Sequence, residues 1–144
     1  MTEAWALHTV QREMKVFTVE QANRTLPLVG RIVEDIVRTY ARWQGKVREH
    51  ELMSATLRPG DDRDLVRVER EAQGLAADLD AFRAELAALG VEFKGYDLGL
   101  VDFPCEMGGR IVYLCWRLGE PSVQYWHEVD AGFTGRRPLS TRAA

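Results

Sequence analysis

A heptad pattern of apolar residues near the middle of the chain constrains its fold more than any other feature. The apolar positions follow one another at alternating spacings of three and four, at Leu65, Val68, Ala72, Leu75, Leu79, Phe82, Leu86 and Leu89. Such spacing is typical of a helix that packs along one seam against another helix. It predicts a long helix that starts near Asp61 or Asp62, whose side chain can cap it, and that ends before Gly90.

A second seam precedes the first one in the sequence. Its apolar positions alternate in the same way, at Val29, Val33, Ile36, Tyr40, Trp43 and Val47. Thr18 and Gln21 fit the capping box of a helix start. Because proline breaks a helix interior, Pro27 predicts a short helix over 19–25 and then a long one that begins at about Pro27. The stretch ATLRPGDD, residues 55–62, predicts the turn between the two seams.

Two such helices joined by a short turn predict an antiparallel helical hairpin of the coiled-coil type. Further apolar residues widen both seams, at Ile32, Val37, Val66 and Ala76. This extra apolar surface predicts self-association through the helices into a homo-oligomer, with a dimer of four helices favoured. The alternative is that the C-terminal part of the same chain covers it.

The pattern changes after Gly90 to short runs rich in β-forming residues, separated by EMGG and LGEP. The runs GLVDFPC, RIVYLCW and SVQYWHE, at 99–105, 110–116 and 122–128, predict a three-stranded antiparallel meander. The prediction is therefore a single α+β domain. Its parts are an N-terminal arm at 1–16, a helical hairpin at 17–90, a β-meander at 91–130 and an irregular tail at 131–144.

Side chains alternate between the two faces of a strand, so the predicted pairing assigns each residue to a face. Symmetric closure of the two hairpins places Asp102 opposite Tyr113, and Val112 opposite His127. His127 then falls on the apolar core face, and Cys115 faces away from it. Asp102, Tyr113 and Glu128 form a row on the other face, which is too aromatic for solvent and too charged for a core.

The first functional hypothesis is a metal site built from Asp102, His127 and Glu128, with Glu120 or Cys115 as further candidates. Carboxylate, imidazole and thiolate are the usual ligands of divalent transition metals. The adjacent His127 and Glu128 point to opposite faces of a regular strand, which weakens a shared site unless a bulge intervenes. The alternative is that His127 forms a hydrogen bond in the core while Glu128 pairs with Arg117 or Arg136.

The second hypothesis is an anion-binding pocket built from Arg117, Arg136 and Arg137, with Arg110 as a further candidate. The planar guanidinium suits carboxylate and phosphate. The alternative is that these arginines pair with acidic neighbours such as Glu120, Glu128 and Asp130, or face water.

The overall charge and hydropathy narrow the class of protein. The formal net charge of −3 argues against a nucleic-acid binder, which needs a basic surface. No apolar run reaches the ~18 residues of a membrane span, and the N-terminus lacks the pattern of a signal peptide. We therefore expect a cytoplasmic protein that interacts with neither nucleic acid nor membrane, with its cysteines reduced.

Four segments together, FTVEQANRTLPLV, GLVDFP, LCWRLGE and WHEVDAGFTGRRPL, resemble the prokaryotic family known as domain of unknown function 2203. The similarity covers about residues 16–139. It implies a small cytoplasmic prokaryotic protein, and it carries over no catalytic or binding residues.

These features favour a self-associating binding or assembly module with a divalent-metal or small-ligand site on the sheet. The alternative is a small metal-dependent enzyme that uses Asp102, His127 and Glu128. The sequence assigns no catalytic residue for such an enzyme.

Overall fold

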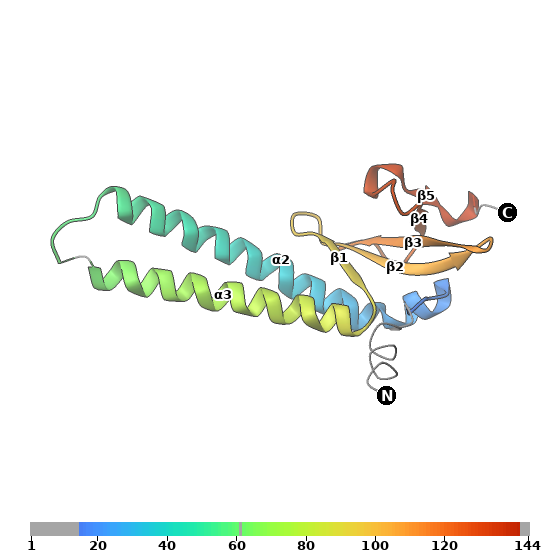
Figure 1. Ribbon diagram of the computed structural model, residues 1–144, viewed down its shortest axis with the longest axis horizontal. Helices are drawn as coiled ribbons and strands as arrows, with labels where there is room; N and C mark the ends of the chain where they lie inside the picture. Colours follow the sequence, from blue (N-terminus) through green and yellow to red (C-terminus); the bar gives the residue numbers. More distant parts are fainter. Residues whose placement is uncertain (1–14, 61, 142–144) are drawn as a thin grey trace, which may run out of the picture.

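The computed structural model of the 144-residue chain describes residues 15–60 and 62–141. Two long helices pack together and are followed by a five-stranded antiparallel sheet, which confirms the α+β class (Figure 1). The elements are α2 (Val19–Ala55), α3 (Asp62–Ala88), β1 (Glu92–Gly95), β2 (Leu100–Met107), β3 (Arg110–Arg117), β4 (Tyr125–His127), β5 (Arg137–Pro138) and the short 3₁₀ helices η1 (Phe133–Gly135) and η2 (Leu139–Thr141). Most of the predicted arm, Asp61 and the last three residues lie outside the described range.

Helix α2 is continuous through Pro27, so the predicted break at this residue is wrong. The capping box of Thr18 and Gln21 does start the helix, with both hydrogen bonds present. Pro27 is exposed, while Ala22 before it and Val29 after it are both fully buried in one core. The chain on each side of Pro27 is thus held on the same surface, and this packing offsets the lost backbone hydrogen bond.

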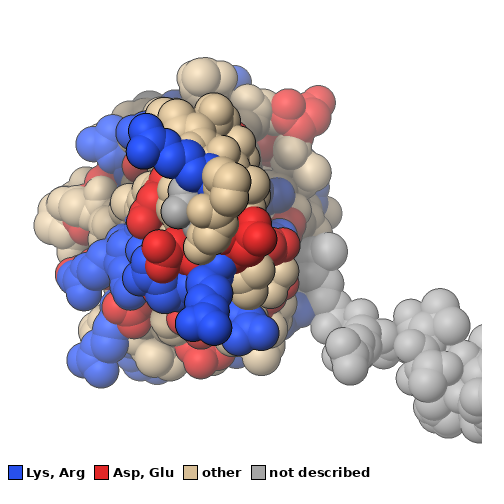
Figure 2. All heavy atoms as spheres, turned by 90° about the vertical axis from the view of Figure 1, so that its left-hand side faces the viewer, with Lys and Arg blue, Asp and Glu red and all other residues tan. Residues whose placement is uncertain are grey.

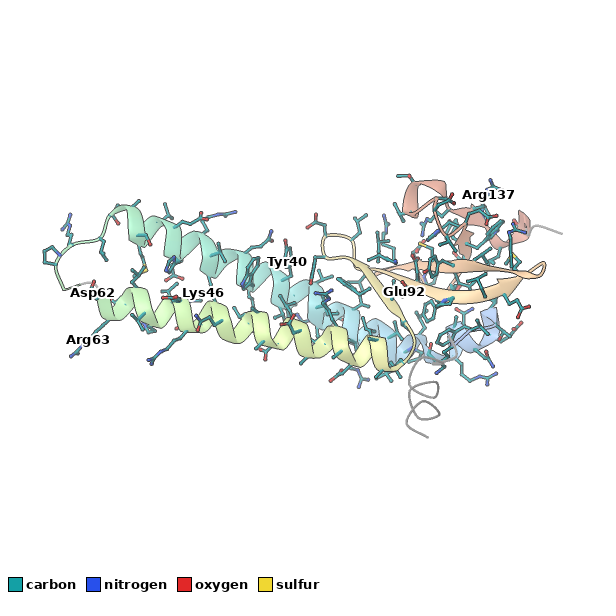
Figure 3. The ribbon with its side chains drawn as sticks, in the orientation of Figure 1. Tyr40, Lys46, Asp62, Arg63, Glu92 and Arg137 are labelled. Atoms are coloured by element: carbon teal, nitrogen blue, oxygen red, sulfur yellow. The ribbon has the colours of Figure 1, made fainter. Side chains whose placement is uncertain are left out.

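The two predicted seams are the buried faces of the helices. Every seam residue of α2 and α3 is buried or half-buried, and Gly90 follows α3 with φ +83. In the part of the hairpin nearer its turn, Lys46 of α2 forms an ion pair of 2.6 Å with Glu71 of α3 (Figure 3). At the far end of the hairpin, Lys and Arg side chains lie beside Asp and Glu (Figure 2). Within the described part of the chain, no helix is both long and apolar enough to span a membrane.

The sheet covers only the near half of the hairpin. Ile32, Val33 and Ile36 share one hydrophobic core with Val101 and Phe103 of β2. The sheet of the same chain therefore covers the apolar surface of this half of the hairpin, which was the alternative to self-association. Beyond it, the hairpin extends away from the sheet (Figure 1).

The sheet has five strands in the order β1-β2-β3-β4-β5, and the predicted count of three is wrong. Strand β1 pairs with β2 at one edge, and β5 pairs with β4 at the other, inside the tail that was predicted to be irregular. These edge strands have only four and two residues, so they are too short to show an alternating pattern.

The first hairpin has a tighter turn than predicted. Gly108 and Gly109 both have positive φ, 60° and 78°, as a two-residue hairpin turn requires. Asp102 therefore lies opposite Cys115 instead of Tyr113. The shift is by two residues, so each side chain keeps its predicted face.

The second hairpin differs from the prediction by one residue, which reverses the faces of β4. His127 lies opposite Tyr113, and Trp126 lies opposite Leu114. Residues 121–124 leave the strand, because Pro121 has no N–H to donate and the Val123 N–H donates to Asn23 of α2 instead (2.7 Å). Trp126 is thus in the core, and His127 joins Asp102 and Cys115 on the other face.

Candidate functional site

The face of the sheet that lies away from the helices carries a polar row. The pairings Glu92↔Asp102 and Asp102↔Cys115 align these side chains across β1, β2 and β3. His127 on β4 lies opposite Tyr113, which precedes Cys115 by two residues in β3. Regular strand alternation therefore places a carboxylate, a thiol and an imidazole on adjacent strands of one face.

Asp102, Cys115 and His127 form a buried cluster, which we call the trio. Their exposed fractions are 4%, 1% and 2%. His127 Nε2 lies 3.0 Å from Asp102 Oδ1, and one potential ligand atom from each residue lies within 4.8 Å of the others. Ligand atoms around a tetrahedral metal are roughly 3–4 Å apart for bonds of about 2.0–2.3 Å. The trio is therefore close to the spacing of a metal site.

The hydrogen bonds of the His127 ring assign the roles of its two nitrogens. Nδ1 lies 2.7 Å from the backbone oxygen of Glu128, which only accepts, so Nδ1 carries a hydrogen. Nε2 faces the Asp102 carboxylate, which also accepts when it is ionised. This contact needs one cation between the two atoms, either a shared proton or a metal ion. Metal-bound histidines commonly donate their other N–H to a backbone carbonyl in this way.

Burial controls the protonation of the other two members. It raises the pKa of the Cys115 thiol to about 11, and the charge of Asp102 adds to this effect. Burial also raises the pKa of Asp102, although His127 opposes the shift. A thiol with a raised pKa is not an activated nucleophile. The geometry thus favours Cys115 as a metal ligand, which loses its proton on binding, over a role as a catalytic nucleophile.

A cavity of about 260 Å³ lies beside the trio. All three members line it, together with Lys94, Leu100, Tyr113, Val129, Gly132 and Phe133. Lys94 Nζ lies 5.2 Å from the centre of the Tyr113 ring and 3.2 Å from a Glu92 oxygen. Tyr113 donates to Glu92, and this bond, with burial, raises the pKa of Tyr113 to about 12. A positive charge and a protonated phenol therefore lie next to the buried ligand atoms.

Arg136 fixes the C-terminal segment over this face of the sheet. Its guanidinium donates to both oxygens of Glu120, at 2.9 and 2.8 Å. It also stacks on the rings of Tyr125 and Phe133, with distances of 3.9 and 4.5 Å to the ring centres. The same guanidinium opposes the rise in the pKa of the Cys115 thiol. Arg136 would thus stabilise a Cys115 thiolate, while Glu120 balances its charge.

Glu128 and the predicted arginines lie elsewhere. Glu128 pairs with Arg110 at the outer part of the sheet, so it does not join Asp102 and His127. Arg136 is bound to Glu120, as in the alternative for the anion pocket. Arg137 stacks over the Trp126 ring at 5.5 Å, and the Arg117 side chain is exposed at the end of β3.

Two residues of the site, Cys115 and Lys94, were not predicted to lie beside His127. Cys115 was expected to face away from His127, because the predicted register was wrong by one residue. Lys94 lies in β1, a strand too short to be predicted. The proline in LGEPS is the one signal that could have indicated the shift in register.

Comparison with known families gives a match over nearly the whole chain. The model of the family described as "Uncharacterized conserved protein (DUF2203)" matches residues 15–139. The chain belongs to the DUF2203 family. Neither the curated proteins nor the solved structures contain a match. The DUF2203 description names no ligand or reaction.

Proposed function

We propose that this protein binds one divalent transition metal ion, of the zinc class, through Asp102, Cys115 and His127. The observation that carries the proposal is the convergence of three potential ligand atoms, with His127 Nε2 3.0 Å from Asp102 Oδ1 and the Cys115 sulfur within 4.8 Å of both residues' ligand atoms. Three protein ligands and one open position are typical of a catalytic zinc site.

The donor set supports zinc over magnesium or calcium. Thiolate and imidazole are soft and borderline ligands that suit zinc, whereas magnesium and calcium prefer oxygen. The widest separation within the trio, at most 4.8 Å, has to close by only roughly 1 Å for tetrahedral bonds. The Nδ1–H bond to Glu128 O already holds the ring of His127 in the orientation that presents Nε2.

The cavity beside the trio supports a binding function that depends on this metal. Because all three residues line a cavity of about 260 Å³, an ion held by them would be within reach of a small molecule in that cavity. An open position on that ion also serves a hydrolytic reaction, since a metal-bound water loses its proton more readily. The metal-dependent enzyme remains the alternative. In this version Cys115 is the third metal ligand instead of Glu128, which was the third candidate from the sequence.

Titration with Co²⁺, which replaces Zn²⁺ and absorbs visible light, tests the proposal. We expect one equivalent to bind and give a sulfur-to-cobalt absorption band. Asp102→Asn, Cys115→Ser and His127→Gln should each weaken binding by about 10- to 100-fold or more. Two matched controls, Cys105→Ser and Glu128→Gln, should bind like the wild type. Equal binding by all five variants, or no binding by the wild type, would refute the site.

Self-association through the helical hairpin is a second candidate function. It is supported by exposed apolar side chains near the far end of the hairpin, where Leu52 is 64%, Leu57 45% and Val66 45% exposed. An apolar groove of about 300 Å³ also lies along the two helices, lined in part by Trp43 and Ala76. We propose a second copy of this chain as the occupant.

Analytical ultracentrifugation of the wild type and of Ala76→Glu tests this association. The wild type should sediment as a dimer and the variant as a monomer with unchanged helix content. A wild-type monomer at high protein concentration would contradict the association and leave the metal site unaffected.

A further inference from the structure

The cavity beside the trio has a mixed lining. The trio and Lys94 contribute polar groups, while Leu100, Val129 and Phe133 contribute apolar side chains, which we call the apolar wall. With a volume of about 260 Å³, the cavity is smaller than the usual range for drug-sized ligands. These dimensions suit a small molecule with one polar end and one short apolar end.

Lys94 supplies a positive charge that is available to a ligand. Its side chain is 41% exposed and lies over the Tyr113 ring. Lys94 lines the same cavity as the three members of the trio. The partner of Lys94, Glu92, is 41% exposed as well and already accepts a hydrogen bond from Tyr113. An exposed ion pair of this kind is weak, so a ligand can compete for the ammonium group.

The charges of the loaded site point to the sign of the ligand. A divalent ion is neutralised by the Asp102 carboxylate and the Cys115 thiolate, while His127 binds in its neutral form. The ammonium group of Lys94, which pairs with Glu92, then supplies a cationic hydrogen-bond donor on the lining of the cavity. A carboxylate matches this arrangement, because one oxygen can bind the metal while the other accepts from the ammonium group.

We infer that the cavity binds small organic monocarboxylates, with the carboxylate between the metal and Lys94 and a short hydrocarbon tail against Leu100, Val129 and Phe133. This inference rests on the proposed metal site. Phe133 and Val129 come from the segment that Arg136 fixes over the sheet, so the apolar wall is held in place by the fold.

The test uses the Co²⁺-loaded full-length protein and follows the visible absorption of the ion. Butyrate is the probe, and 1-butanol and butylamine are matched controls with the same tail. We expect butyrate to change the spectrum saturably, and we expect the two controls to have no effect. Lys94→Met should weaken butyrate binding by about tenfold or more. Lys46→Met, which changes a lysine on the helical hairpin, should leave it unchanged.

The outcomes separate the two proposals. A protein that does not take up Co²⁺ overturns the metal site and the inference together. The carboxylate inference alone is overturned if butyrate does not change the spectrum of the Co²⁺-loaded protein, or if 1-butanol changes it equally. Tighter binding of inorganic phosphate than of butyrate also overturns it. Unchanged butyrate affinity in Lys94→Met overturns the position assigned to the carboxylate.

Discussion

The contact between Asp102 and His127 makes a specific prediction about coupling in the metal-free protein. Both side chains are almost completely buried, and their contact of 3.0 Å joins β2 to β4 through side chains of strands that do not pair directly. Asp102→Ala leaves His127 without a partner on Nε2, and His127→Ala leaves the Asp102 carboxylate with only the weak thiol donor of Cys115. Each single variant therefore keeps an unsatisfied polar group in the interior.

Removal of one member of a buried charged pair costs about 3–5 kcal/mol of unfolding free energy. The double variant removes both polar groups, so it should lose less than the sum of the two single variants. Because a hydrogen bond to a charged group contributes about 1.5–3 kcal/mol, we expect a coupling energy of about 2 kcal/mol. Total stability is about 5–15 kcal/mol for a domain, so each single variant should lose a large part of it.

Urea unfolding of the four proteins in the presence of a chelator measures this coupling. A matched cycle pairs Asp102→Ala with Cys105→Ala, whose buried side chain lies on the opposite face of β2. That cycle should be additive within about 0.5 kcal/mol. Additive costs for Asp102 and His127 as well would refute the idea that they share a proton in the metal-free protein.

Further predictions concern the glycines and one ion pair. Gly99→Ala should cost about 2–4 kcal/mol, since φ is +66° and the new carbon would lie 2.8 Å from Leu118 Cβ. Gly45 lies inside α2, and no atom lies within 4 Å of a Cβ added there, so Gly45→Ala should stabilise the protein by about 0.5–1 kcal/mol. Urea unfolding measures the free-energy change of both variants. Burial tends to raise the pKa of Glu120, but Arg136 and the backbone N–H and charge of Arg117 together outweigh it and lower that pKa from its usual value of 4.5. The stability from this pair should therefore be complete above about pH 4.5 and be lost as pH falls through the folded pKa. Glu120→Gln should be less stable than the wild type at pH 7, with a difference that shrinks in acid; a constant difference would contradict the argument.

The helices could be predicted from the sequence because their seams are long and regular. Val68, Leu75, Leu79 and Leu86 are all buried as the heptad spacing requires. The predicted break at Pro27 was wrong because it considered only the effect of proline on the local backbone. The burial of the helix in the core on both sides of Pro27 could not be seen from the local sequence. Here tertiary packing outweighs one missing hydrogen bond.

The sheet and the site could be predicted only in part. Asp102 and His127 were identified by their chemistry, and the structure does place them in contact. Their shared face depends on the path of residues 121–124, which a hydrogen bond to Asn23 on a distant helix fixes. A side-chain contact over 100 positions leaves no trace in the local pattern, so neither the face of His127 nor the partnership with Cys115 could be predicted. The tertiary fold decides the register of a strand as short as β4.

Native mass spectrometry with elemental analysis shows whether the trio holds one metal ion. The wild type, supplied with one equivalent of Zn²⁺, should carry one ion per chain, while Cys115→Ser at the same concentration should be mostly metal-free. The ion should also stay on Glu128→Gln, whose side chain lies with Arg110. A metal-free wild type, or equal zinc on the wild type and Cys115→Ser, would contradict the claim and would leave Asp102 and His127 as a buried pair that shares a proton.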